Sequence, residues 1–203
     1  MPAERTGPMA GIVLAAGTST RMGQNKLFFA LEGETILRRA VGRATAAGLD
    51  PVIVVLGYEA DRARHELAGL PCRTVVNPDY ERDINLSLRT GLAALPAEAR
   101  AAVVMLADMP FVTTSMIATL VERYRKSTSP LVISDYAGVN APPMLYDRSL
   151  FPELEAMEGE GCGKQVVRRH KSEAEAVPWP AAALADLDVP DDYERVKAQL
   201  AAG

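Results

Sequence analysis

The alternation of short apolar runs with longer segments of helical period constrains the fold of this chain more than any other feature. Residues 11–16 (GIVLAA), 51–56 (PVIVVL) and 102–106 (AVVML) are rich in Val and Ile and carry no charge. Strands that are apolar throughout are buried on both faces, which is typical of a parallel sheet covered by helices. The alternation therefore predicts an α/β fold built from βαβ units.

The remaining elements follow from the same two patterns. Shorter strands are expected at 72–76 and 131–134, and helices at 34–47, 59–67, 86–95, 113–125 and 192–200. From residue 136 the alternation loosens, with a strand-like run at 142–146 and helical runs at 151–157 and 164–170. No linker or internal repeat divides the chain, so residues 1–203 are expected to form a single domain, with residues 1–8 disordered.

Composition argues against several classes of partner. The formal net charge is −4, whereas nucleic acids and anionic membranes call for an extended basic surface. The 2 cysteines, Cys72 and Cys162, form no CxxC pair, so neither a disulfide framework nor a cysteine-based zinc site is expected. No apolar run reaches the length of about 18 residues that a membrane helix needs, and no secretory leader is recognisable. We therefore expect a cytoplasmic protein that binds small molecules, not nucleic acid or membrane.

The loop at 14–26 (LAAGTSTRMGQNK) carries most of the chemical information. Small residues directly after a buried strand let the backbone pass close to a ligand, where amide N–H groups can bind phosphate oxygens. Arg21 and Lys26 supply the positive charge that a triphosphate requires. The spacing fits neither the P-loop pattern GxxxxGK[ST] nor the dinucleotide pattern GxGxxG. The loop therefore predicts a phosphate site of another kind.

A carboxylate is expected near this loop. Asp108 follows the strand expected at 102–106, and the next two residues, Met109 and Pro110, stiffen the turn. In phosphoryl chemistry, Mg²⁺ typically takes one or two carboxylates together with substrate oxygens. Asp108 is therefore the candidate magnesium ligand.

The loop resembles the signature LAAGxSxRMGxxK of the MobA-like nucleotidyltransferases, and within them of the MocA-type molybdenum cofactor cytidylyltransferases. Residues 107–110 (ADMP) resemble the family's second motif, and residues 186–192 (DLDVPDD) resemble its closing DxDTPxD segment. The resemblance covers nearly the whole chain. It implies a Rossmann-like three-layer fold with a mostly parallel sheet, of the nucleotide-diphospho-sugar transferase type, in which 136–175 is an acceptor-side elaboration. It also implies a nucleoside triphosphate donor and a molybdopterin-type acceptor.

The resemblance assigns roles to particular residues. Lys26 would stabilise charge on the transferring phosphoryl group, Arg21 would hold the leaving pyrophosphate, and Asp108 would bind Mg²⁺. Glu160 and Asp188 are alternatives for a second metal ligand, since both lie in segments where the family carries aspartates. The residues expected to bind the nucleotide are Leu14, Ala15, Ala16, Gly17, Arg21, Lys26 and Ser87.

The chain departs from the family pattern at two places. Asp83 stands where a glycine is common, shortly before Ser87. Residues 140–143 (NAPP) stand where family members commonly read Arg-Gly-His-Pro, so the arginine and the histidine are both absent, and neither Pro142 nor Pro143 has a backbone N–H to donate. We therefore expect the acceptor to be recognised differently from the family standard.

The function expected from these residues is magnesium-dependent transfer of a nucleoside monophosphate to a small phosphorylated acceptor, with release of pyrophosphate. CTP is the favoured donor, because the loop reads Ala15-Ala16-Gly17, whereas the guanylyl branch usually has Ala-Gly-Gly. A guanylyltransferase or sugar-1-phosphate nucleotidyltransferase of the same fold is an alternative, and so is a non-catalytic nucleotide-binding regulator. A molybdoenzyme or a chaperone is a candidate protein partner.

Overall fold

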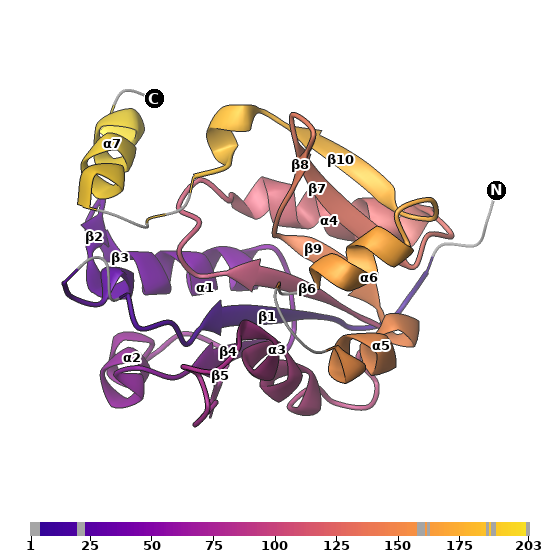
Figure 1. Ribbon diagram of the computed structural model, residues 1–203, viewed down its shortest axis with the longest axis horizontal. Coiled ribbons are helices and arrows are strands. Elements are labelled where there is room, and N and C mark those ends of the chain that lie inside the picture. Colours follow the sequence, from indigo (N-terminus) through magenta and orange to yellow (C-terminus); the bar gives the residue numbers. More distant parts are fainter. Residues whose placement is uncertain are drawn as a thin grey trace.

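The computed structural model describes residues 5–19, 23–157, 161, 163–185, 187 and 190–201. Four parallel strands form one half of its main sheet, in the order β5-β4-β1-β6 (Figure 1). Their bounds are β1 (Met9–Ala15), β4 (Val52–Leu56), β5 (Arg73–Val76) and β6 (Ala101–Leu106). The burial of every residue in β1 and β4 agrees with the uncharged runs that predicted them.

The other half of the sheet continues from β6 in the order β9-β7-β10. β9 (Met144–Asp147) runs antiparallel to β6 and to β7 (Leu131–Tyr136), whereas β10 (Glu175–Trp179) is parallel to β7. β8 (Val139–Asn140) pairs with β7 as a short hairpin. The part of the chain that the structure describes therefore forms an 8-stranded, mostly parallel sheet, which confirms the predicted α/β fold.

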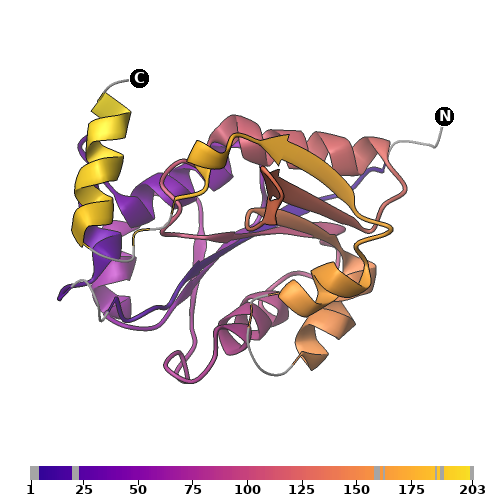
Figure 2. The same ribbon diagram turned by 45° about the horizontal axis from the view of Figure 1, so that its top comes forward.

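Helices cover both faces of this sheet and complete three layers (Figure 2). One face carries α1 (Ile36–Ala46) and α4 (Thr114–Lys126), and the other carries α3 (Ile84–Ala93), α5 (Phe151–Ala156) and α6 (Lys164–Arg169). Side-chain caps fix where helices begin: Thr35 accepts from the backbone N of Arg38 at 3.2 Å, and Thr113 from that of Met116 at 3.2 Å.

The smaller elements lie mainly beyond the carboxyl ends of the strands. They include α2 (Ala60–Glu66), the hairpin of β2 (Ala30–Leu31) and β3 (Glu34–Thr35), and α7 (Pro190–Ala201). Within the described ranges the chain also forms the short 3-10 helices η2 (Lys26–Phe28), η3 (Arg148–Leu150) and η4 (Ala181–Ala183). In both ribbon views α7 stands beside the β2–β3 hairpin, and the Tyr193 hydroxyl donates to the Ala30 carbonyl at 2.6 Å.

Several predicted boundaries were wrong. The helix expected at 34–47 begins at Ile36, because Glu34 and Thr35 pair with β2 and Thr35 caps the helix. The strand expected at 142–146 begins at Met144, since the two prolines before it have no N–H to donate. Within the segment 136–175, β9 enters the main sheet between β6 and β7.

The chain start is also more ordered than expected. The backbone N of Arg5 donates to the Arg125 carbonyl at 3.0 Å, and its guanidinium donates to the carbonyls of Thr128 at 2.6 Å and Ser129 at 2.7 Å. These bonds attach the start of the chain to the end of α4, so the predicted disorder does not extend over residues 5–8. Among the described residues, each helix is too short or too polar to cross a bilayer.

Candidate active site

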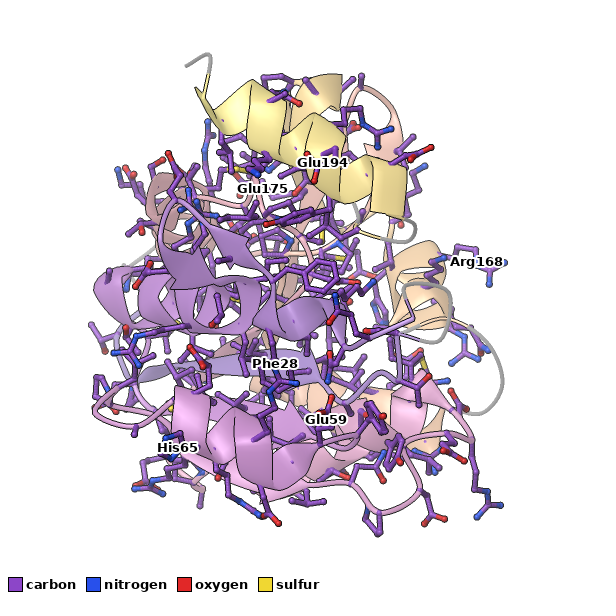
Figure 3. The ribbon with its side chains drawn as sticks, turned by 90° about the vertical axis from the view of Figure 1, so that its left-hand side faces the viewer. Phe28, Glu59, His65, Arg168, Glu175 and Glu194 are labelled. Carbon is purple, nitrogen blue, oxygen red and sulfur yellow. The ribbon has the colours of Figure 1, made fainter. Side chains whose placement is uncertain are left out.

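The carboxyl ends of β1, β5 and β6 lie at one edge of the sheet, and the segments that follow these strands surround a cavity of about 290 Å³. The arrows of β1 and β6 point toward this edge in Figure 1, and Figure 3 looks onto it. Ligands of open α/β sheets bind at such an edge. The cavity is lined by Leu14, Ala15, Ala16, Gly17, Thr18, Ser19, Lys26, Leu27, Tyr80, Ile84, Ser87, Leu106 and Asp108.

The loop after β1 forms one wall of the cavity. Ala16 is buried and Gly17 is exposed. A Cβ added at Gly17 would meet no heavy atom within 4 Å, so packing within the chain does not require glycine there. The open space beside Gly17 instead lets a ligand approach the backbone closely.

Lys26 and Asp108 come together from different parts of the chain. The Lys26 Nζ lies 2.5 Å from the Asp108 Oδ2, and their side chains are 13% and 21% exposed. The backbone N of Ala107 donates to the Leu14 carbonyl at 3.0 Å, which joins the segment after β6 to the carboxyl end of β1. Lys26 and Asp108 therefore lie next to each other at the cavity.

The position of Lys26 is set by its neighbours in η2. Asn25 is buried, and its Oδ1 accepts from the backbone N of Leu27 at 3.2 Å and from the Ser19 hydroxyl at 3.4 Å. The ring of Phe28 lies 3.9 Å from the Arg62 guanidinium carbon of α2, and Arg62 contacts Glu59 at 3.1 Å (Figure 3). Contacts on both sides of Lys26 thus hold its backbone beside the cavity.

Ser87 reaches the cavity from the first turns of α3. It is buried, and its hydroxyl accepts from the Asn77 amide at 3.0 Å. Asp83 caps this helix by accepting from the backbone N of Asn85 at 2.8 Å. The departure at Asp83 thus has a structural explanation, because aspartate is a strong N-cap.

Sequence reasoning missed several residues of the cavity wall, above all Tyr80 and Ile84. A Cβ at Gly57 would lie 2.5 Å from the Tyr80 Cγ and 2.6 Å from the Ala16 carbonyl oxygen, so Tyr80 can lie there only because Gly57 has no side chain. Ile84 is 41% exposed, which is unusual for a large apolar side chain and leaves an apolar face toward the cavity. The sequence signal for this close packing is Gly57, which directly follows the buried strand β4.

Three predicted site residues, Arg21, Glu160 and Asp188, lie outside the described residues. Within the described ranges, no group of three or more His, Cys, Asp or Glu side chains is arranged to hold a metal. A single carboxylate at the cavity nevertheless fits Mg²⁺, which binds through one or two carboxylates and completes its shell with substrate phosphates and water. The Asp108 carboxylate is paired with the Lys26 ammonium at 2.5 Å and borders the cavity.

Comparisons with known proteins agree with this geometry. The MobA-like NTP transferase domain family matches residues 11–174. The purine catabolism protein PucB of Bacillus subtilis is 29% identical, over 93% of this chain and 96% of that protein. The crystal structure of Rv0371c from Mycobacterium tuberculosis has a TM-score of 0.84 at 27% identity, covering 96% of this chain and 100% of that one. A structure of Rv0371c in complex with manganese has a TM-score of 0.81 at 27% identity and covers 94% of this chain and 98% of that one.

Proposed function

We propose that this chain, which belongs to the MobA-like NTP transferase domain family, transfers a nucleoside monophosphate to a small phosphorylated acceptor of the molybdopterin type. CTP is the preferred donor, and CMP is the group that is transferred. Pyrophosphate is the second product. The observation that carries the proposal is the 2.5 Å contact between Lys26 and Asp108 beside a loop of small residues, in a cavity at the carboxyl ends of parallel strands.

The reaction needs no protein nucleophile. An oxygen of the acceptor phosphate attacks the α-phosphorus in line, a new P–O bond forms, and the bond to the β-phosphate oxygen breaks as pyrophosphate leaves. Lys26 stabilises the negative charge on the α-phosphoryl oxygens, and Arg21 holds the leaving pyrophosphate. The acceptor phosphate is already ionised near neutral pH, so no general base is required.

Asp108 is the residue that would hold Mg²⁺. When bound there, the metal neutralises charge on the phosphate oxygens and helps to align the triphosphate. The manganese complex of Rv0371c, similar in fold and at 27% identity, supports a divalent metal in this protein too. The ammonium of Lys26 compensates the charge of the Asp108 carboxylate.

The preference for CTP rests on the small residues of the wall. Ala16 lines the cavity, and the guanylyl branch usually has glycine at this position. The extra methyl group of the alanine takes up space in the cavity, which hinders a purine base more than the smaller pyrimidine base. Differences of one methyl group in a pocket are worth about 1–3 kcal/mol, so the expected preference is moderate.

The proposed acceptor is recognised differently from the family standard because of residues 140–143. Asn140 pairs with Asp135 in the β7–β8 hairpin. The Tyr136 hydroxyl donates to the Pro142 carbonyl at 2.9 Å, and the Ser134 hydroxyl donates to the Pro143 carbonyl at 2.6 Å. The segment is thus tied to β7 and offers neither a cationic side chain nor a proline N–H to an acceptor.

A matrix of the four nucleoside triphosphates against molybdopterin and sugar 1-phosphates tests this proposal, with pyrophosphate release as the measurement. We expect the highest rate with CTP and molybdopterin. A higher rate with a sugar 1-phosphate would mean that the acceptor is a sugar phosphate and not molybdopterin. A higher rate with GTP would mean that the donor is GTP and not CTP. Tight binding of a nucleotide without any pyrophosphate release would favour the regulatory alternative.

A further inference from the structure

Arg43, in the last turn of α1, is tied to the segment that carries Asp108. Its Nη1 donates to the carbonyl of Pro110 at 2.6 Å and to the carbonyl of Val112 at 2.6 Å. We propose that Arg43 is a positioning residue, which holds the turn after β6 so that the Asp108 carboxylate faces the cavity in a fixed orientation. The inference rests on the proposed function, since it assigns Asp108 to metal binding.

Besides Arg43, two backbone hydrogen bonds and packing in the core hold the turn at 107–112. The backbone N of Ala107 donates to the Leu14 carbonyl at 3.0 Å, and that of Val112 donates to the Met109 carbonyl at 3.3 Å. Met109 and Val112 are buried in the core cluster that also contains residues of α1 and α4. Arg43 binds two carbonyls within four residues after Asp108, and it thereby limits the rotation of this segment against the sheet.

The chemistry of Arg43 supports a role beyond filling space. Burial, with a smaller contribution from the neighbouring charge of Arg39, lowers the pKa of Arg43 to about 10. Keeping a guanidinium in such a place is costly, and an apolar side chain would fill it at lower cost. What the guanidinium adds is two charge-assisted hydrogen bonds to the turn.

The same helix also holds the segment of Lys26. The backbone N of Ile36, the first residue of α1, donates to the Phe29 carbonyl directly after η2. One end of α1 is therefore bonded to the segment of Lys26, and its last turn to the segment of Asp108. Because α1 is a rigid helix, it holds Lys26 and Asp108 at fixed positions relative to each other and so preserves their 2.5 Å contact.

Arg38 offers a matched control on the same helix. Its Nη1 also donates to two backbone carbonyls, of Glu66 at 2.8 Å and of Ala68 at 3.2 Å, but these lie at the last residue of α2 and just beyond it. Neither carbonyl is in a residue that lines the cavity. Loss of Arg38 therefore removes bonds of the same kind without releasing the turn of Asp108.

The test compares Arg43→Met, Arg43→Lys and Arg38→Met with the wild type. Two quantities are measured: the affinity for Mn²⁺ in the presence of CTP, from the spin-resonance signal of free Mn²⁺, and the rate of pyrophosphate release as a function of Mg²⁺ concentration. We expect Arg43→Met to weaken Mn²⁺ binding and to lower kcat by about 10- to 100-fold, as is typical when a residue that orients a metal ligand is lost. The Mn²⁺ affinity and kcat of Arg43→Lys should lie between those of Arg43→Met and the wild type, because the lysine ammonium keeps the charge but lacks the planar fork of the guanidinium.

Arg38→Met should lose comparable thermal stability while its Mn²⁺ affinity and kcat stay near those of the wild type. Equal Mn²⁺ affinity and kcat in Arg43→Met and Arg38→Met would overturn the inference. If Arg43→Met does not fold, Arg43→Lys decides on the same two quantities. A wild type that binds Mn²⁺ but releases no pyrophosphate would refute the proposed function alone, and a wild type that binds no Mn²⁺ would refute both.

Discussion

Replacing Lys26 with alanine should separate catalysis from folding. The side chain of Lys26 contacts Asp108 at 2.5 Å and is 13% exposed, whereas that of Asp108 is 21% exposed and borders the cavity. Water in the cavity can hydrate Asp108 once the ammonium is gone. The lost ion pair should therefore cost about 1 kcal/mol of stability, as is usual for pairs with access to solvent.

The two effects should differ clearly in size. For a chain of this length, a loss of about 1 kcal/mol corresponds to a fall in Tm of about 2–4 °C. Removing one group that stabilises charge in the transition state typically lowers kcat by about 10²- to 10³-fold, which is about 2.7–4 kcal/mol. The rate, measured as pyrophosphate release at saturating CTP, should thus fall far more than stability.

The matched control is Lys126→Ala. Lys126 contacts Glu122 at an equally short 2.5 Å, but both lie on the exposed surface of α4 and neither lines the cavity. This variant should keep the wild-type kcat. A kcat near the wild-type value in Lys26→Ala, or an equal loss in both variants, would refute the role of Lys26.

Further predictions concern the metal, the donor, acid stability and the acceptor. Asp108→Asn should abolish both activity and the dependence on Mg²⁺, and an unchanged metal titration would exclude Asp108 as a ligand. Ala16→Gly should raise the affinity for GTP relative to CTP in calorimetry, whereas tighter binding of GTP by the wild type would contradict the assigned donor. Burial alone would raise the pKa of Asp147, but hydrogen bonds from Tyr124 and Ser149 outweigh it and hold that pKa below its ordinary value. The resulting stabilisation is complete above the ordinary pKa of an aspartate and is lost as the pH falls through the lowered pKa, so Asp147→Asn should flatten the acid limb of the unfolding free energy against pH. If Lys164 and Arg168 of α6 compensate for the cations missing at 140–143, Lys164→Ala and Arg168→Ala should each slow transfer to molybdopterin. The hypothesis of altered acceptor recognition would be wrong if these rates are unchanged and the wild type uses molybdopterin as efficiently as an ordinary family member.

The elements that position the candidate site could be predicted because their signals are local. β1, β4 and β6 are uncharged runs, and parallel strands present their carboxyl ends at one edge. That rule alone places the segments of Lys26 and Asp108 near each other. The 2.5 Å contact between them agrees with it.

Other parts could not be predicted because they depend on long-range contacts. β10 is an edge strand that contains Pro178 and only one buried residue, so it has no apolar run to mark it. Tyr80 comes from a turn, and its place depends on the missing side chain of Gly57. Arg43 meets Pro110 across 67 positions of the chain, and nothing in its local pattern distinguishes it from the other arginines of α1.

The most direct test of the central claim follows two labelled phosphorus atoms of CTP, one at the α and one at the γ position, in the presence of Mg²⁺ and molybdopterin. We predict that the α label moves to the acceptor and that the γ label appears in pyrophosphate in equal amount. Release of the γ label as inorganic phosphate, with the α label left in CDP, would contradict it. So would recovery of both labels in intact CTP while the nucleotide remains bound.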